Sequence, residues 1–160
     1  TQLQFAPNQE YILYSASRRS DAVLTWDLRA LSSSSSSDDQ AQASSYTPIR
    51  GMKSFATVAD TNQRLEFALN DDGKTLFVGG RDSLVRVYDT QSGEQVGEIN
   101  PPTGNDIVAA NGVSFCRAAA SQGYLAVVTG SRRFLDDEDK DDVGASGNQV
   151  PSGYLSLYKV

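Results

Sequence analysis

The side chains that could bind or react in this 160-residue chain are mainly arginines, of which there are ten, beside a single cysteine and no histidine. Guanidinium groups bind phosphate bidentately and stack on unpaired bases, so the arginines are candidates for contacting single-stranded RNA. The lack of histidine removes the usual zinc sites and Ser-His nucleophiles. Cys116 cannot form an internal disulfide, fits a reducing compartment, and is predicted to be a buried, inert thiol.

Patterns that would indicate catalysis are weak. Asp71-Asp72 and Asp38-Asp39 have the character of turn or loop pairs rather than of carboxylates facing each other across a cleft. Gly79-Gly80 follows an apolar run, but no helix pattern and no Lys-Ser/Thr follows it, so it does not fit a phosphate-binding loop. The acidic run from Asp136 to Asp142 lacks the spacing of a calcium-binding loop. We therefore expect no enzymatic activity, no metal and no cofactor.

Charge and hydropathy limit the partners. The net charge is −6, but the run from Asp136 to Asp142 contributes −5, so the remainder is near neutral and RNA is not excluded as a partner. No apolar run approaches the roughly twenty residues of a membrane span, and no charged-then-apolar leader opens the chain. We expect a soluble, intracellular protein with no membrane partner and no small-molecule substrate. Because the chain starts at Thr1 on a strand-like segment, we expect it to be a fragment of a longer protein.

Three short strands joined by two tight turns are predicted between Arg64 and Thr90. Arg64 to Ala68 alternates apolar and polar residues, Leu76 to Val78 is an apolar run, and Leu84 to Tyr88 alternates again. Turn residues separate these segments at Asn70 to Gly73 and at Gly79 to Ser83. An antiparallel meander of this kind has a face to bury and needs neighbours of the same kind.

The same pattern occurs twice more, from Leu3 to Leu28 and from Gly112 to Val160. Matched aromatic residues mark the first strand of each unit (Phe5, Phe67 and Phe115) and the end of the third strand (Trp26, Tyr88 and Tyr158). We predict that the three phenylalanines occupy equivalent places in stacked sheets. The aromatic residues of the third strands are expected in the core or between sheets rather than as a platform for stacked bases.

An aromatic residue followed by aspartate at the end of the third strand, with Asp21 or Asp82 in the turn before it, resembles the pattern of WD-repeat β-propellers. The resemblance implies an all-β chain that is part of a propeller, with about three blades of antiparallel four-stranded sheet, the third incomplete. The predicted blades are 1–56 with a serine-rich insert at 32–45, 57–100, and 101–160 with an acidic insert at 132–149. Both inserts are expected to be mobile. The Gly-His dipeptide of many blades is missing, which indicates a divergent family.

In a blade, the turns between the second and third strands open on the same face as the connections between blades. The resemblance therefore places half of the arginines on one rim: Arg18, Arg19, Arg81, Arg132 and Arg133. Amides that could read base edges beside them come from Asn62, Gln63, Asn105 and Asn111. The alternative is that the arginines pair with nearby carboxylates and only solvate the rim.

Two residues near this rim have their own predictions. Arg64 opens a strand and is a further candidate for RNA contact, but pairing with Asp60 or Glu66 is the more common role for such a residue. Gly130 is predicted to hold a backbone conformation, or a close approach, that a Cβ would obstruct.

A more specific resemblance joins loops and strands. Its segments are AVLTWDLR from Ala22, TNQR from Thr61 leading into LEFALNDDGKTLFVGG, NGVSF from Asn111, and LAVVTGSRRF from Leu125 with an acidic insert behind it. Together they look like the C-terminal blades of the telomerase Cajal body WD-repeat protein family, whose fungal relatives are linked to small nuclear RNPs and mRNA splicing.

This second resemblance implies a nuclear, Cajal body-like location. It also implies small nuclear or small Cajal body RNA, including telomerase RNA in animals, and RNP proteins as partners. The expected function is a non-catalytic adaptor that binds such RNA and supports RNP localisation or assembly. The alternative is a protein-binding WD-repeat scaffold without an RNA role, in which the arginine rim binds acidic peptides.

Overall fold

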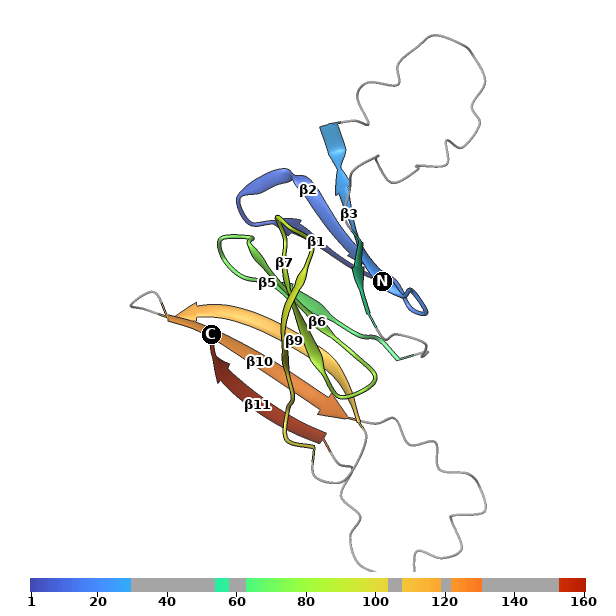
Figure 1. Cartoon of the computed structure of the whole chain (residues 1–160), viewed down its shortest axis with the longest axis vertical. Coiled ribbons are helices and arrows are strands. Elements are labelled where there is room, and N and C mark those ends of the chain that lie inside the picture. Colours follow the sequence, from blue (N-terminus) through green and yellow to red (C-terminus); the bar gives the residue numbers. More distant parts are fainter. Residues whose placement is uncertain (30–53, 58–62, 104–107, 119–121, 131–152) are drawn as a thin grey trace, which may run out of the picture.

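The computed structural model describes residues 1–29, 54–57, 63–103, 108–118, 122–130 and 153–160. Within these ranges the regular elements are β-strands, which form three antiparallel sheets, two of four strands and one of three. Figure 1 shows the sheets one after another along the molecule, with the middle sheet between the other two. The predicted all-β class is confirmed, and the arrangement is consistent with part of a WD-repeat β-propeller.

Sheet A contains the first four strands in chain order: β1 (Gln2–Ala6), β2 (Gln9–Ala16), β3 (Ala22–Asp27) and β4 (Ser54–Ala56). Pro7 and Asn8 form the tight β1–β2 turn, in keeping with the turn preference of both residue types. Arg19 takes a left-handed conformation, with φ at 60°, in the β2–β3 turn. The sequence pattern does not locate β4, because only three of its residues pair with β3.

Sheet B repeats this meander with β5 (Phe67–Leu69), β6 (Thr75–Gly79), β7 (Val85–Asp89) and β8 (Gln95–Ile99). Gly73, at φ 69°, provides the left-handed residue of the β5–β6 turn, and Ser83, at φ 70°, that of the β6–β7 turn. On the outer strand, Val87 pairs with Gly97 and Tyr88 with Gln95. Val96 is therefore an extra residue, a β-bulge, on an exposed edge strand.

Sheet C contains β9 (Ala109–Ala118), β10 (Gln122–Gly130) and β11 (Gly153–Lys159), with β10 in the middle. The sequence pattern predicts that the third sheet is incomplete. The described residues contain three strands of it and no fourth. The serine-rich and acidic inserts at 32–45 and 132–149, which were expected to be mobile, lie outside the described residues.

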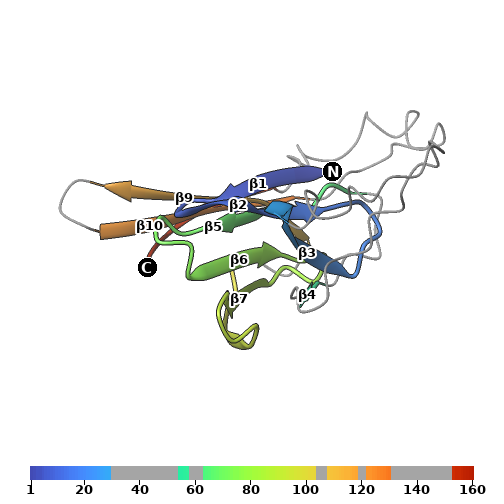
Figure 2. The ribbon, with the colours of Figure 1, turned by 90° about the horizontal axis from the view of Figure 1, so that it is seen from above.

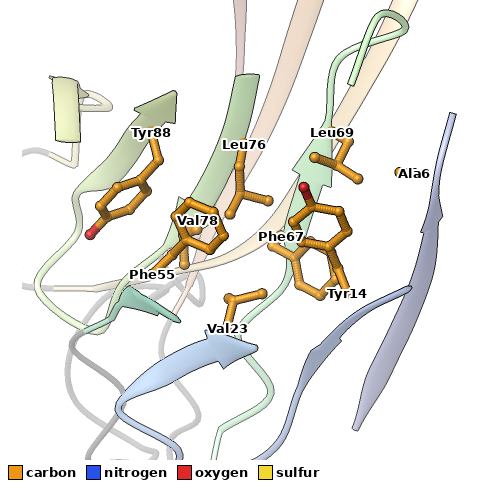
Figure 3. Packing of buried hydrophobic residues seen from close by; sticks show 9 residues of the cluster. All are labelled: Ala6, Tyr14, Val23, Phe55, Phe67, Leu69, Leu76, Val78 and Tyr88. Atoms are coloured by element: carbon orange, nitrogen blue, oxygen red, sulfur yellow. The ribbon is translucent and has the colours of Figure 1, made fainter. Parts of the chain in front are cut away.

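Two apolar cores hold the three sheets together. The first lies between sheets A and B, where Tyr14, Phe55, Phe67 and Tyr88 are in contact through their rings (Figure 3). The second lies between sheets B and C and contains Phe77, Val85, Ala110, Val113, Leu125 and Val127. Because each face of sheet B packs on a neighbouring sheet, β5 and β6 are buried almost throughout, whereas sheets A and C each have one buried face.

The strand register corrects one part of the predicted repeat alignment. Trp26 pairs with Leu13, which pairs with Phe5, and Tyr158 pairs with Leu125, which pairs with Phe115. In sheet B, Tyr88 pairs with Leu76, which pairs with Leu69. Phe5 and Phe115 are thus equivalent, as predicted, but their counterpart in sheet B is Leu69. Phe67 lies two residues earlier, on the same face, because side chains alternate with a period of two.

The strand ends gather at two edges of the stack. Figure 2 shows β1 and β9 pointing one way across the view and β6 pointing the other. The starts of β1, β5 and β9 therefore lie at the same edge as the ends of β2, β6 and β10, in agreement with the registers. We call this edge the arginine edge, defined by Arg18, Arg19, Gln63, Arg64 and Arg81. The other edge, with the β5–β6 and β7–β8 turns, is called the opposite edge.

Candidate nucleic-acid interface

The arginine edge brings together three short segments that are distant in sequence. Arg18 and Arg19 are exposed in the β2–β3 turn, Arg81 is exposed in the β6–β7 turn, and Gln63 and Arg64 precede β5. The meander topology explains this grouping, because every second-to-third-strand turn opens on the side where the chain enters the next sheet. The predicted placement of these residues on one edge follows from the observed registers.

Backbone hydrogen bonds fix the turns of this edge to the neighbouring chain segments. The Thr57 amide donates to the Asp21 carbonyl at 2.7 Å, and the Ala110 amide donates to the Gly80 carbonyl at 2.8 Å. The Ser83 hydroxyl is buried; it donates to the Val108 carbonyl at 2.6 Å and accepts from the Val108 amide at 3.2 Å. The turns therefore belong to the rigid framework of the edge, which suits a pre-organised binding surface.

An ion pair inside the β6–β7 turn adds to this framework. Arg86 donates two hydrogen bonds to the Asp82 carboxylate, at 3.2 and 2.5 Å, and the Arg86 side chain is only 14% exposed. These hydrogen bonds, together with the positive charge of Arg86, lower the pKa of Asp82. A Cβ on Gly80 would overlap the Asp82 carboxylate, which explains the glycine at that position. Asp82, predicted as a structural residue, thus organises the turn that presents Arg81.

Arg64 has an acidic partner within the chain. Its Nε lies 3.2 Å from Glu66 Oε1, which is one of the two carboxylates expected for it, while the other, Asp60, lies outside the described residues. The Arg64 side chain remains 56% exposed. Arg64 can therefore still reach a ligand, but only in competition with Glu66.

Other predicted RNA contacts fall where no structure is described. Asn62, Asn105, Arg132 and Arg133 lie outside the described ranges. Asn111 lies in β9, and its carbonyl accepts a hydrogen bond from the Glu66 amide at 3.2 Å. The described part of the candidate interface is therefore Arg18, Arg19, Gln63, Arg64 and Arg81.

The described turns give the two edges opposite charge balances. The arginine edge contains four basic residues and three acidic ones. They are Arg18, Arg19, Arg64 and Arg81, and Asp21, Glu66 and Asp82. Two of these three carboxylates are bound by arginine side chains, Glu66 by Arg64 and Asp82 by Arg86. At the opposite edge, the acidic residues at the strand ends and turns (Glu10, Asp27, Asp71, Asp72, Asp89 and Glu94) outnumber the basic ones (Arg29, Lys74, Arg117 and Lys159). An anionic ligand is therefore attracted to the arginine edge over the opposite edge.

The shape of the arginine edge favours an extended ligand. The recess between sheets A and B at this edge, lined in part by Ser17, Ser20 and Thr57, has a volume of only about 10 Å³. That is room for about one water molecule. A ligand too large for this recess would bind across the exposed turns beside it, as a nucleic-acid backbone can.

A larger cleft lies at the opposite edge and was not foreseen from the sequence. It opens between sheets B and C with a volume of about 420 Å³, and Phe77, Val87, Ile99 and Phe115 provide its apolar lining. Gly97 contributes to it by lacking a side chain, since a Cβ there would meet nothing within 4 Å. The sequence signal was Gly97 itself, because a glycine inside a strand often marks a place where a side chain is absent for a reason.

Aromatic residues at the ends of the third strands have different environments. Tyr88 is 4% exposed in the first core and donates a hydrogen bond to the Ala56 carbonyl at 2.6 Å. Tyr158 packs against the second core. Trp26 lies on the outer face of sheet A, where its indole N–H donates to the Ser15 hydroxyl at 2.7 Å. Packing between sheets therefore holds for Tyr88 and Tyr158, while Trp26 is only half-buried.

Two predictions about single residues are wrong. Cys116 is exposed, because it pairs with Tyr124 on the face of sheet C that points away from sheet B. A Cβ on Gly130 would meet none of the described residues within 4 Å, and its φ lies outside the left-handed region, so neither of the predicted reasons for glycine is found among them. The close approach is at Gly79, where a Cβ would overlap the Ala110 carbonyl.

Among the described residues, no cluster of three or more potential metal ligands occurs. The same ranges contain no helix of sufficient length and apolarity to span a bilayer.

Comparison with known proteins gives limited guidance. No protein-family model matches the chain, and no curated protein matches it. Solved structures do match, among them one titled "Structure of U3-55K", which is 19% identical and has a TM-score of 0.43. That alignment covers 79% of this chain and 34% of the other, so the chain spans about a third of the length of U3-55K.

Proposed function

We propose that this chain is part of a non-catalytic WD-repeat adaptor that binds single-stranded segments of small nuclear or small Cajal body RNA through its arginine edge. The observation that carries the proposal is the gathering of exposed Arg18, Arg19 and Arg81 on one edge beside Gln63 and Arg64. Guanidinium groups at the tips of rigid turns suit phosphates and unpaired bases, which single-stranded RNA offers together.

The resemblance to the telomerase Cajal body WD-repeat family supports the same reading and provides its biological setting. An adaptor of this kind would act in the nucleus, at Cajal body-like sites, together with RNP proteins. It would support RNP localisation or assembly, and its link to splicing or to telomerase would follow from the RNA that it binds. No catalytic group is needed for this role.

A protein-binding scaffold without an RNA role is the second candidate function. The Arg64–Glu66 ion pair favours it, because it shows that one candidate arginine already binds a carboxylate in this chain. In this role the arginine edge would bind acidic peptides.

The two functions are separated by measuring binding of the 160-residue chain to labelled RNA by fluorescence anisotropy. The probes are a single-stranded fragment of a small nuclear RNA, a scrambled RNA of equal composition, and an acidic peptide. We expect the small nuclear RNA fragment to bind more tightly than the scrambled RNA. Equal affinity for both RNAs, with binding to the acidic peptide, would favour the scaffold.

Paired substitutions locate the binding surface. Arg18→Ala with Arg81→Ala removes two exposed guanidinium groups from the arginine edge, and we expect the Kd for the RNA fragment to rise roughly tenfold or more, or about 1.4 kcal/mol. The matched control is Arg29→Ala with Arg117→Ala, which changes the net charge equally at the opposite edge, where these side chains are 63% and 56% exposed. A similar loss of affinity in both variants would show general charge attraction and contradict a defined edge.

A further inference from the structure

The cleft between sheets B and C at the opposite edge leaves apolar side chains accessible inside the fold. Val87, Ile99 and Phe115 line it, and each is only partly buried against the second core. The volume of about 420 Å³ lies within the range of protein ligand sites, which is roughly 300–1,000 Å³. Contiguous apolar surface of this kind marks a place where a partner binds.

The contact between sheets A and B shows how the same positions look when they are closed. There, Phe55 is 1% and Leu69 4% exposed. The strand registers make Ile99 the counterpart of Phe55, and Phe115 the counterpart of Leu69. Since both counterparts are only partly buried, the contact between sheets B and C is open where the first contact is closed.

The side chain that the second contact lacks at this place is an aromatic ring. Phe55 stacks on Tyr14 with 6.2 Å between ring centroids, whereas Ile99 has no ring to offer. The counterpart of Tyr14 is Phe77, which stacks on Phe115 at 6.1 Å with the ring planes 9° apart. Both of these rings line the cleft. A further ring in the cleft would therefore meet aromatic neighbours, with which aromatic side chains pack favourably.

Two glycines shape the cleft. A Cβ at Gly97 would meet nothing within 4 Å, so the space beside β8 stays open. A Cβ at Gly123 would lie 2.9 Å from ring atoms of Phe115, so glycine lets this ring lie close to β10. The accessible rings and the open space thus both depend on glycines in the adjoining strands.

A fourth strand in sheet C would not close the cleft. The equivalent strand of sheet B is β8, and the described residues of the first core come from β1 to β7, with none from β8. The burial of Phe55 and Leu69 therefore comes from the packing of one sheet on the other. Completing sheet C in the same way would leave Ile99 and Phe115 accessible to a partner.

The polar side chains that line the cleft have partners within the chain. Asn70 donates to the Thr75 hydroxyl at 3.3 Å, and Glu98 accepts from a neighbouring glutamine at 2.8 Å. Arg117 Nε lies 3.4 Å from an Asp71 carboxylate oxygen. Small-molecule sites orient their ligands through a few converging polar groups, so this lining better suits an apolar side chain carried by a peptide. Because acidic residues outnumber basic ones at the opposite edge, basic residues in that peptide would be attracted there.

From these observations we propose that the cleft binds a linear peptide of a protein partner through one aromatic side chain, with lysine or arginine on either side of it. The ring would lie beside Ile99, as the Phe55 ring lies in the first contact. Removal of apolar surface from water provides the driving force. The cleft and the arginine edge are at opposite edges, so the chain would hold this peptide and RNA at the same time.

Fluorescence anisotropy with short labelled peptides tests the chemistry of the occupant. The probe contains lysine-tryptophan-lysine between glycine and serine residues, and matched peptides replace the tryptophan by alanine or both lysines by glutamate. We expect the 160-residue chain to bind the probe and to bind the alanine peptide roughly tenfold more weakly, because the anchor ring is lost. The glutamate peptide should also bind more weakly, with a difference that shrinks at high salt.

Substitutions that fill the cleft test its position. Gly97→Val and Ile99→Phe place larger side chains in it, both of types that suit a strand. Each should raise the Kd of the probe roughly tenfold, because the space for the anchor ring is taken. The matched control is Val96→Ala, at a 63% exposed residue of the same strand outside the cleft lining, which should leave the Kd unchanged. RNA affinity should be the same in all three variants, so a failure of the cleft and a failure of the arginine edge are read separately.

Circular dichroism and thermal unfolding show whether the variants fold. Amide chemical shifts of the unaltered chain provide a measurement that needs no variant, since the probe should shift the Ile99 and Phe115 signals. Three results would overturn the proposal: equal binding of the tryptophan and alanine peptides, an unchanged Kd in the folded cleft-filling variants, or shifts confined to residues away from the cleft. Tighter binding of N-acetyltryptophanamide than of the probe would also overturn it, because the site would then suit a small aromatic molecule.

Discussion

At the scale of single residues, the candidate interface depends on side chains that do not themselves touch a ligand. Asp82 and Arg86 hold the β6–β7 turn, and Gly80 leaves the space that their ion pair needs. Ser83 joins this turn to the chain entering sheet C through two hydrogen bonds with Val108. The position of Arg81 at the edge is thus a consequence of packing and hydrogen bonding behind it.

Asp82→Asn should destabilise the chain at neutral pH by about 1–3 kcal/mol, because Arg86 would lose its charged hydrogen-bond partner. The pKa of Asp82 is lowered in the folded state, so its stabilising effect is present above the unfolded pKa of 3.8 and is lost as the pH falls through the lower folded value. Urea denaturation of both proteins at neutral pH and below pH 3.8 measures this. A difference between them that stays constant with pH would contradict the ion pair.

Gly79→Ala and Gly97→Ala, both in strands of sheet B, should act in opposite directions. A Cβ at Gly79 overlaps the Ala110 carbonyl, so we expect destabilisation of about 1–3 kcal/mol through forced backbone movement. A Cβ at Gly97 meets nothing within 4 Å, so we expect a gain of about 0.4–1 kcal/mol through reduced entropy of the unfolded chain. Thermal unfolding of the two variants measures the difference, and equal destabilisation by both would count against the close approach of β6 and β9.

At the scale of elements, the strands with clear alternation or apolar runs were predictable, and the short outer strands were not. The strands β6, β7 and β10 agree closely with the segments expected from periodicity, because their residues are buried on one or both faces. β4 has three residues and β8 contains a bulge, so neither shows a regular pattern. The register error at Phe67 arose because a shift of two residues keeps the same face, which hydrophobic pattern alone cannot detect.

The candidate site was predictable only as far as topology fixes it. The grouping of Arg18, Arg19 and Arg81 follows from the meander, since equivalent turns open at the same edge. The Asp82–Arg86 pair and the cleft beside Gly97 were not foreseen, because both depend on side-chain packing between strands. Gly130 was misinterpreted for the same reason, as the sequence does not show which glycine lies against another backbone.

Gln2 provides an element-scale prediction, because it covers the free edge of β5. Its amide makes two hydrogen bonds to the Phe67 backbone and so joins sheet A to sheet B. We expect Gln2→Ala to speed hydrogen exchange of the Phe67 amide and to cost about 1–2 kcal/mol of stability. Gln4→Ala, two residues along on the same face, is the matched control and should leave Phe67 exchange unchanged. Equal exchange in both variants would contradict this role.

At the scale of the whole molecule, the charged, hollowed and apolar surfaces lie in different places. The arginine edge is formed by turns, the cleft lies at the opposite edge, and the apolar outer faces lie at the two ends of the stack.

The salt dependence of RNA binding tests the arginine edge most directly. For single-stranded RNA, log K falls with log salt concentration by roughly 0.7 for each phosphate contact. We predict that Arg18→Ala with Arg81→Ala lowers this slope by about 1.4, since two contacts are lost. The opposite-edge control, Arg29→Ala with Arg117→Ala, should leave the slope unchanged. A slope that is the same in the arginine-edge variant and the unaltered chain would contradict the account.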